Sequence, residues 1–299
     1  MTMKRMLIFG VSGMLGHELF YYLYNNNYDV FASVREKSIL DNYYPDELMA
    51  RIITKVDALD LGSIRKAIIQ IRPDIVINCI GIIKQLSESK DHVLSISINA
   101  LFPHQLASLC GEYNCRLIHV STDCVFNGQK GDYTESDFPD ADDLYGRTKY
   151  LGEVDYKNAV TLRTSIIGHE LKGRRSLVDW FLSQNEEVNG FSNAIYSGFP
   201  TIEFASIIDK YVIPHDDLRG VYHVSSRPIS KYDLLKLIAG VYGKKISIRK
   251  DSEFKIDRSL NSNRFRLKTG YSPPSWEQLV ANMHDDYLAR EHLYTACVR

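Results

Sequence analysis

Short apolar runs alternate with longer amphipathic stretches over the first 165 residues of the chain. The runs contain many β-branched residues and are apolar at consecutive positions, as is typical of strands covered by helices on both faces. The predicted strands are residues 6–9, 30–34, 52–56, 75–80, 117–120 and 160–162, and the predicted helices are residues 14–24, 64–71, 93–113 and 145–156. This alternation predicts an α/β fold with a doubly wound parallel sheet of the Rossmann type.

The alternation breaks down after residue 165, where glycines and a proline interrupt the chain. The expected elements there are helices at 177–182 and 233–241 and short strands at 221–224 and 246–248. A last helix should begin at Trp276, with Ser275 as its N-cap. We therefore expect a first domain at 1–165 and a smaller C-terminal α/β lobe at 166–299. Segments such as 203–225 could return to pack on the first domain.

Composition and charge narrow the range of partners. The 299 residues are 44% hydrophobic and 24% charged, and their net charge of −1 provides no overall field to attract nucleic acid or an anionic membrane. No apolar run approaches the roughly 20 residues that a membrane span requires. The N-terminus enters a strand almost at once, which leaves no room for a signal peptide.

The cysteines are odd in number and lack a paired C-x-x-C spacing, which predicts reduced thiols in a cytoplasmic protein. They are Cys79, Cys110, Cys115, Cys124 and Cys297. The histidines share no metal-ligand spacing, so no metal site is expected.

A glycine-rich turn joins the first predicted strand to the first predicted helix. Gly10, Gly13 and Gly16 are spaced G-x-x-G-x-x-G, which suits a tight turn, a close approach to a pyrophosphate and close packing of helix on sheet. The free amides at the start of the helix favour the negative charge of a dinucleotide. The alternative is a purely structural turn. The residues expected to line the cofactor here are Gly10, Ser12, Gly13, Met14, Leu15 and Gly16.

The residues after the second predicted strand bear on the choice between NAD and NADP. An NAD site usually has an acidic residue there, whereas an arginine accommodates the 2′-phosphate of NADP. Arg35 could bind that phosphate with help from Ser33 or Lys37, and this favours NADPH. Glu36 leaves NADH open, and a solvated charge pair on a loop is the alternative to either role.

Two further strand ends should face the same cofactor. Asp57 follows the third predicted strand and could accept a hydrogen bond from the adenine amine, or could instead cap the helix near Leu61. Cys79, Ile80 and Gly81 end the fourth strand, where the backbone should pass close to the nicotinamide. The small Gly81 suits that approach.

Tyr145 and Lys149 are four residues apart, so both side chains should leave one face of a helix. A cationic lysine beside a phenol is expected to lower the pKa of the tyrosine and to support proton transfer. Lys149 could also bind the nicotinamide ribose. Thr122 ends the fifth predicted strand and could hydrogen-bond a carbonyl that is being reduced. Y-x-x-x-K arises often by chance on helix surfaces, but here it occurs together with this threonine and the glycine turn.

These motifs resemble those of an extended short-chain dehydrogenase/reductase and, within that class, the dTDP-4-dehydrorhamnose reductase (RmlD-like) family. The string Ser-Thr-Asp-Cys-Val-Phe-Asn-Gly is the most specific part of the resemblance. The resembling segments, which span nearly the whole chain, are residues 10–16, 121–128, 133–135, 145–149, 152–153, 162–165, 199–201 and 258–261.

The resemblance implies NAD(P)H-dependent reduction of the 4-keto group of a nucleotide-linked deoxysugar in surface polysaccharide biosynthesis. By position, Thr122 would polarise the carbonyl, Tyr145 would donate the proton, and Lys149 would support Tyr145 and the cofactor ribose. The family commonly has Tyr at the position of Cys124 and Trp at that of Ile166, both close to the sugar. Their loss puts dTDP-rhamnose synthesis itself in doubt and indicates a different sugar or nucleotide. Some members use Mg²⁺ in dimerisation, but no acidic cluster here indicates it, and a homodimer stays open.

Substrate-binding candidates lie at the strand ends and in the second lobe. They are Thr122, Asp123, Arg163, Arg174 and Arg258, the arginines being suited to a nucleotide diphosphate. A solvated loop is the alternative for Arg174.

Two other functions remain open. A nucleotide-sugar epimerase or dehydratase would keep NAD tightly bound, and a dehydratase would usually have an acidic pair after Thr122, where this chain has Asp123 and Cys124. A non-catalytic nucleotide-binding regulatory subunit would tend to lose Tyr145 or Lys149, and both are present.

Overall fold

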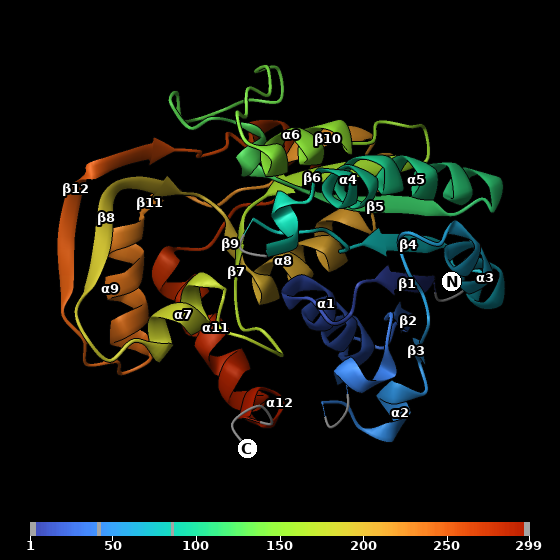
Figure 1. Ribbon diagram of the computed structural model, residues 1–299, viewed down its shortest axis with the longest axis horizontal. Helices are drawn as coiled ribbons and strands as arrows, with labels where there is room; N and C mark the ends of the chain where they lie inside the picture. The colour runs from blue at the N-terminus through green and yellow to red at the C-terminus, as the bar shows by residue number, and fades with distance from the viewer. Residues whose placement is uncertain (1–3, 41–42, 85–86, 296–299) are drawn as a thin grey trace.

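A seven-stranded parallel sheet forms the centre of the protein (Figure 1). The computed structural model describes residues 4–40, 43–84 and 87–295. The sheet order is β10-β6-β5-β4-β1-β2-β3, and every neighbouring pair is parallel. The strands are β1 (Arg5–Phe9), β2 (Asp29–Ser33), β3 (Ile52–Ile53), β4 (Ile75–Asn78), β5 (Arg116–Thr122), β6 (Ala159–Thr164) and β10 (Gly220–His223). The predicted α/β fold with a doubly wound sheet is confirmed.

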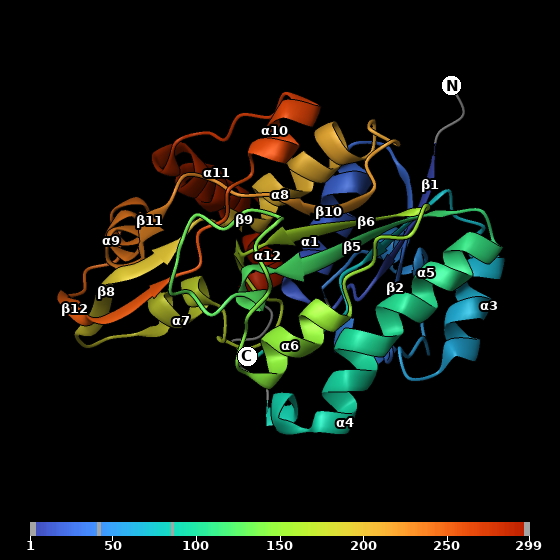
Figure 2. The ribbon, with the colours of Figure 1, turned by 90° about the horizontal axis from the view of Figure 1, so that it is seen from above.

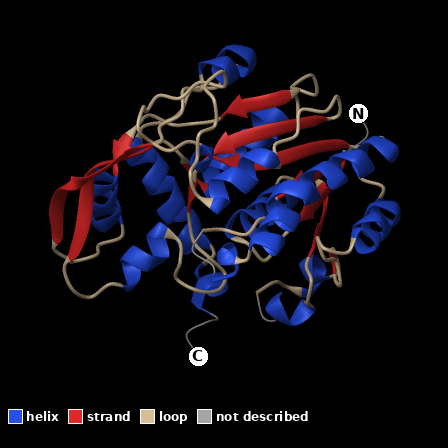
Figure 3. Cartoon of the chain, turned by 45° about the horizontal axis from the view of Figure 1, so that its top comes forward, coloured by secondary structure: helices blue, strands red, loops and turns tan. Residues whose placement is uncertain are grey.

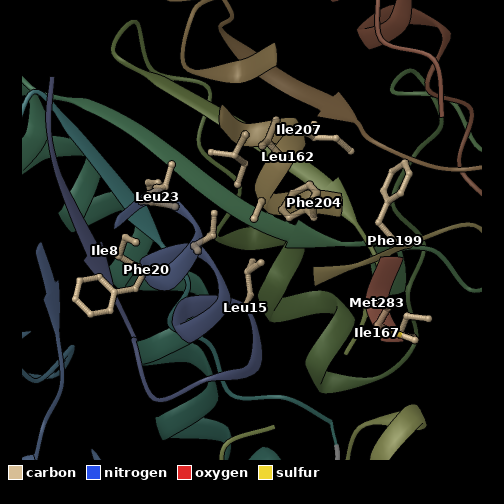
Figure 4. Packing of buried hydrophobic residues seen from close by; sticks show 14 of the residues in the cluster. Ile8, Leu15, Phe20, Leu23, Leu162, Ile167, Phe199, Phe204, Ile207 and Met283 are labelled. Carbon is tan, nitrogen blue, oxygen red and sulfur yellow. The ribbon is translucent and has the colours of Figure 1, made fainter. Parts of the chain in front are cut away.

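Helices cover both faces of the sheet (Figure 2). Along β1, Met6 and Ile8 face one hydrophobic core, whereas Leu7 and Phe9 face the other, as expected of a strand that is buried on both sides. The helices of this part are α1 (Met14–Asn25), α2 (Asp46–Met49), α3 (Leu61–Ile71), α4 (His92–Ser95), α5 (Phe102–Glu112), α6 (Leu144–Leu151) and α8 (Thr201–Ile207). Figure 4 shows side chains of α1 and α8, such as Phe20 and Phe204, in the same hydrophobic core as Ile8 and Leu162 of the sheet.

The predicted helix 93–113 is interrupted. A π-helical turn, Ile96–Leu101, separates α4 from α5. Among the described residues, the stretch His92–Glu112 is long and apolar enough to cross a membrane by length and composition, and 56% of its most apolar window is buried within the protein.

A second lobe carries its own small sheet of β8 (Val188–Tyr196), β11 (Ile229–Ser230) and β12 (Ile248–Asp257), set apart from the main sheet in Figure 3. Its helices are α7 (Leu177–Ser183), α9 (Lys231–Val241), α10 (Asn263–Thr269), α11 (Trp276–Ala289) and α12 (Glu291–Thr295), and β7 (Ile166–Ile167) pairs with β9 (Phe199–Pro200). The strand predicted at 246–248 is wrong in extent, because it begins at Ile248 and continues for ten residues. The predicted cap is confirmed, since the Ser275 side chain accepts from the Gln278 N–H.

The chain returns from the second lobe to the main sheet. β10 pairs with β6, and α8 packs against α1 on the same side of the sheet. The C-terminal helices also reach α1, where Arg290 forms a buried ion pair with Glu18 at 2.7 Å and Tyr294 Oη lies 3.3 Å from His17 Nε2. A boundary at residue 165 remains a prediction.

Candidate active site

The glycine turn has the geometry of a dinucleotide site. Gly10 has φ +93°, and a Cβ on Gly16 would overlap the carbonyl oxygen of Gly10, so these two glycines are required by the backbone itself. Gly13 differs: it has an ordinary φ of −84°, and a Cβ there would meet protein atoms only at 3.5 Å. Gly13 is also the N-cap of α1, without a side-chain capping bond. Room above this glycine and the uncapped helix start fit a bound pyrophosphate.

The region proposed to select between NAD and NADP is partly solvent-facing. Arg35, Glu36 and Lys37 are all exposed after β2, where Arg35 is free to reach a 2′-phosphate. Ser33 is buried, and its carbonyl accepts from the Val11 N–H. Arg35 and Lys37 therefore remain the proposed contacts to the phosphate.

Asp57 does not cap a helix. Its Oδ1 accepts from the Leu59 N–H at 2.9 Å, whereas Asp60 accepts from the Gly62 N–H and is the N-cap of α3. The capping alternative for Asp57 is therefore wrong, and contact with the adenine remains its proposed role.

The end of β4 connects the cofactor loop to the catalytic helix. A Cβ on Gly10 would lie 3.0 Å from Ile80 Cγ1 and 3.2 Å from the carbonyl carbon of Cys79. A Cβ on Gly81 would lie 4.0 Å from Lys149 Nζ. The structure thus brings together three of the predicted segments, the glycine turn, residues 79–81 and the helix of Lys149, which are widely separated in sequence.

Tyr145 and Lys149 lie on α6, which ends at Leu151 rather than at the predicted 156. Asp143 caps this helix by accepting from the Gly146 N–H at 2.7 Å. The helix packs tightly on the end of β5, because a Cβ on Gly146 would overlap the carbonyl oxygen of Cys124. The helix that carries the tyrosine and the lysine therefore contacts β5 and the turn that follows Thr122, and α6 lies beside the end of β5 in Figure 2.

The charge relationship between the two side chains differs from the prediction. Lys149 is buried, its Nζ donates to the Val120 carbonyl at 2.9 Å, and burial lowers its pKa to about 8. Burial also raises the pKa of Tyr145 above its ordinary value, with the nearby Cys124 adding to the effect and Thr122 opposing it. The expectation that Lys149 lowers the pKa of Tyr145 is not met, because burial dominates. A phenol with a raised pKa stays protonated and can donate.

Thr122 closes a short turn at the end of β5. Its Oγ1 accepts from the Cys124 N–H at 3.1 Å and lies 3.1 Å from Asp123 Oδ1. Both Thr122 and Asp123 are buried, and burial raises the pKa of Asp123 while the positive charge of Arg258 opposes the shift.

The predicted substrate arginines have different environments. Arg258 lies near the site, with Nε donating to the Phe126 carbonyl at 2.7 Å and Nη1 at 3.9 Å from Cys124 Sγ. Arg174 is exposed in the loop before α7. Ile166 is half-buried on β7, next to Phe199.

The prediction that Arg163 binds substrate is wrong. Its guanidinium is buried and forms two hydrogen bonds with Glu153, at 2.7 and 2.6 Å, and a third contact with His223 Nε2 at 3.1 Å. Ser121 Oγ also donates to Glu153, at 2.8 Å. Each nitrogen of Arg163 already has a partner within the protein, so none faces a ligand.

Sequence reasoning missed Asn99, which holds the chain next to Gly81, where the nicotinamide is expected. Its carboxamide accepts from the Ile82 N–H at 2.9 Å and donates to the Ile82 carbonyl at 3.0 Å, fixing the chain just after Gly81. Asn99 lies in the π-helical turn, which periodicity does not indicate. Among the residues that the structure describes, no group of three or more His, Cys, Asp or Glu could hold a metal ion. Cys79, Cys110, Cys115 and Cys124 are free thiols, and Cys297 lies outside the described residues.

Comparison with solved structures agrees with this fold. A crystal structure titled dTDP-4-dehydrorhamnose reductase from Bacillus anthracis, in complex with NADP, superimposes with a TM-score of 0.78 at 23% identity, covering 95% of this chain and 100% of that one.

Curated relatives are similar over most of the chain. The Bacillus subtilis spore coat polysaccharide biosynthesis protein SpsK is 28% identical over 77% of this chain and 76% of its own length. The Danio rerio methionine adenosyltransferase 2 subunit beta is 24% identical over 80% of this chain and 74% of its own length. A Streptomyces antibioticus protein named as a probable dTDP-4,6-dihydroxy-2-methyloxan-3-one 4-ketoreductase is 27% identical over 96% of this chain and 97% of its own length. The profile of the RmlD substrate binding domain family matches residues 3–289, and the chain belongs to that family.

Proposed function

We propose that this protein uses NADPH to reduce the 4-keto group of a nucleotide-linked deoxysugar. The observation that carries the proposal is the convergence of Thr122, Tyr145 and Lys149 beside the glycine turn, with Gly81 as the link. The names of the reductase relatives support the sugar and the cofactor. Arg35 supports NADPH over NADH, which stays open because of Glu36.

Thr122, Tyr145 and Lys149 each have a separate role in the proposed reaction. Thr122 donates a hydrogen bond to the substrate carbonyl oxygen and polarises it. Tyr145 gives its phenolic proton to that oxygen as the C–O double bond becomes a single bond, so that the ketone becomes an alcohol. The cofactor supplies the hydride to the carbonyl carbon and leaves as NADP⁺. Lys149 holds the nicotinamide ribose, and its positive charge stabilises the phenolate that remains.

The proposed substrate contacts are fewer than predicted. Arg258, beside Cys124, is the proposed contact for the sugar or its diphosphate, and Arg174 is a second candidate on its exposed loop. Cys124 and Ile166 stand where the family commonly has Tyr and Trp close to the sugar, and this difference favours a sugar other than 4-dehydrorhamnose.

The relatives' names support a place in surface polysaccharide biosynthesis. We place the enzyme in the cytoplasm, where NADPH and nucleotide sugars are made. A homodimer is also proposed, because apolar side chains such as Val93 on α4 and Leu151 on α6 are exposed. Sedimentation of the purified protein tests that assembly.

The direct test is a stopped-time screen of NADPH oxidation with several 4-keto-6-deoxy nucleotide sugars. We expect oxidation that depends on the sugar, with the alcohol at C4 identified in the product by NMR. Proven NADPH binding without turnover of any such sugar would contradict the proposal.

Two alternatives give different results. An epimerase or dehydratase would purify with stoichiometric NAD and would not consume added NADPH. A non-catalytic regulatory subunit would bind nucleotide without turnover, and one relative is named as a subunit, methionine adenosyltransferase 2 subunit beta. The paired Tyr145 and Lys149 favour an enzyme over that second alternative.

A further inference from the structure

Thr122 has a hydrogen-bonding conflict that its proposed role must resolve. A threonine hydroxyl has one hydrogen to donate and two lone pairs that accept. One lone pair of Thr122 Oγ1 is taken by the Cys124 N–H, at 3.1 Å. Asp123 Oδ1 lies 3.1 Å from the same oxygen. The single hydrogen can therefore go to Asp123 or to the substrate carbonyl, but not to both.

The ionisation state of Asp123 determines which acceptor receives the hydrogen of the Thr122 hydroxyl. An ionised carboxylate only accepts, and a hydrogen bond to it is about twice as strong as a neutral one. Thr122 then points its hydrogen at Asp123 and offers the substrate nothing. A neutral carboxyl group instead donates its own hydrogen to the free lone pair of Thr122 Oγ1. The threonine hydrogen is then released toward the carbonyl.

We propose that Asp123 is a positioning residue whose neutral carboxyl group donates to Thr122 and aims the threonine hydroxyl at the substrate carbonyl. The inference rests on the reductase function proposed above. It adds a second proton, carried by Asp123, that must be present for the reaction but is not consumed by it. The chemistry balances, because the Asp123 proton is not transferred and Tyr145 remains the proton donor.

The surroundings of Asp123 support a neutral form. The residue is 7% exposed, and its burial raises the pKa of the carboxyl group. The side chains that face it are Thr122 and Cys124 on its own turn, Tyr145 on α6, Tyr196 on β8, Lys231 on α9 and Arg258 after β12. Arg258, Lys231 and hydrogen bonds from Thr122 and Cys124 favour the ionised form and limit the shift, but burial has the larger effect on this pKa.

The experiment compares the pH profile of kcat in the wild type and in Asp123→Asn. An asparagine amide can donate to Thr122 at every pH and never becomes an anion. We expect kcat of Asp123→Asn within about threefold of the wild type at the acid end of the profile, and a ratio of variant to wild type that rises about tenfold per pH unit above the pKa of Asp123. Lys149 titrates in both proteins and cancels in the ratio. The charge of Asp123 also raises the pKa of Tyr145, so the ratio is compared only at pH values where the phenol is protonated in both proteins. Asp217→Asn, a carboxylate paired with Lys268 on the surface, is the matched control and should leave the profile unchanged.

Two further measurements keep the inference testable if that variant folds poorly. Thr122→Val removes the hydroxyl, so kcat should lose its dependence on residue 123 in a double-mutant cycle. Infrared difference spectra of the substrate-free enzyme, recorded as the pH is raised from the acid to the alkaline end of its stable range, should show the loss of one buried carboxylic acid band. This measurement needs no substrate, and the band should be absent from Asp123→Asn.

The outcomes are distinct. A ratio that stays constant with pH, or a folded Asp123→Asn that binds NADPH but is inactive at every pH, would overturn the inference. Failure of the reductase proposal would appear as no turnover by the wild type, with the infrared band still reporting on Asp123.

Discussion

Arg163 and Glu153 form a doubly hydrogen-bonded ion pair directly beneath the catalytic strand edge. Both side chains are buried, and Glu153 also accepts from Ser121, the residue before Thr122. The negative charge of Glu153 raises the pKa of Lys149, in opposition to burial. The pair therefore supports the catalytic residues from inside the protein.

Removing one member of this pair should be costly. Glu153→Gln leaves a buried guanidinium without its counterion, and we expect a loss of about 3–5 kcal/mol in the free energy of unfolding, measured by urea denaturation. Glu153→Leu combined with Arg163→Met should recover most of that loss, because no unpaired charge remains. Glu112→Gln, in an exposed pair with Arg65, is the control and should change little. Equal losses in the single and double variants would contradict this view.

Two glycines of the cofactor turn should respond differently to alanine. Gly16→Ala places a Cβ on the Gly10 carbonyl, so we expect destabilisation of about 1–3 kcal/mol or failure to fold. Gly13→Ala has space and an ordinary φ, so we expect an unchanged melting temperature and at least about tenfold weaker NADPH binding, a loss of about 1.4 kcal/mol. Calorimetry and cofactor fluorescence measure the two quantities. Unchanged affinity in Gly13→Ala would argue against a pyrophosphate at this site.

Tyr145→Phe should remove the proton donor while preserving the pocket. We expect kcat to fall by roughly 10²–10⁴-fold with NADPH affinity retained. Tyr150→Phe, on an exposed part of the same helix, is the matched control and should keep full activity. Turnover of Tyr145→Phe at the wild-type rate would refute the assigned role.

The buried Lys149 predicts a specific dependence of stability on pH. Its pKa is about 8 in the folded protein and near 10.5 in the unfolded chain, so the unfolded chain binds more protons between these values. Stability from this group therefore rises with pH over that interval. Relative to Lys149→Met, the wild type without cofactor should gain about 2 kcal/mol from pH 7.5 to pH 10. Lys157→Met, at an exposed site, should show no such difference, and parallel curves for all three proteins would contradict the burial argument.

Much of the first half of the fold was predictable because its strands are buried on both faces and therefore read as continuous apolar runs. β12 was missed over most of its length because it is largely exposed and carries alternating charges such as Lys250, Asp251 and Glu253. β8, with only four of its nine positions buried, gave a similarly weak signal.

The site residues that were predictable also depend on local sequence patterns, and those that were not depend on tertiary packing. Tyr145, Lys149 and Thr122 were accessible from sequence because helical spacing and strand ends are local properties. Arg163 was misassigned because a strand-end arginine looks the same whether it faces a ligand or a buried Glu153. The link between Gly81 and Lys149 depends on tertiary packing, which no local pattern encodes.

The position of β10 at the edge of the main sheet has a consequence for synthesis on the ribosome. β6 has no neighbour on its outer side until residues 220–223 emerge, and residues 165–219 lie between the two strands. At ~5–20 residues per second, translation leaves that edge uncovered for roughly 3–11 s. An open strand edge is a template for pairing with other chains. The nascent enzyme therefore passes through a period in which chaperones, rather than its own fold, must protect the sheet that later holds the cofactor.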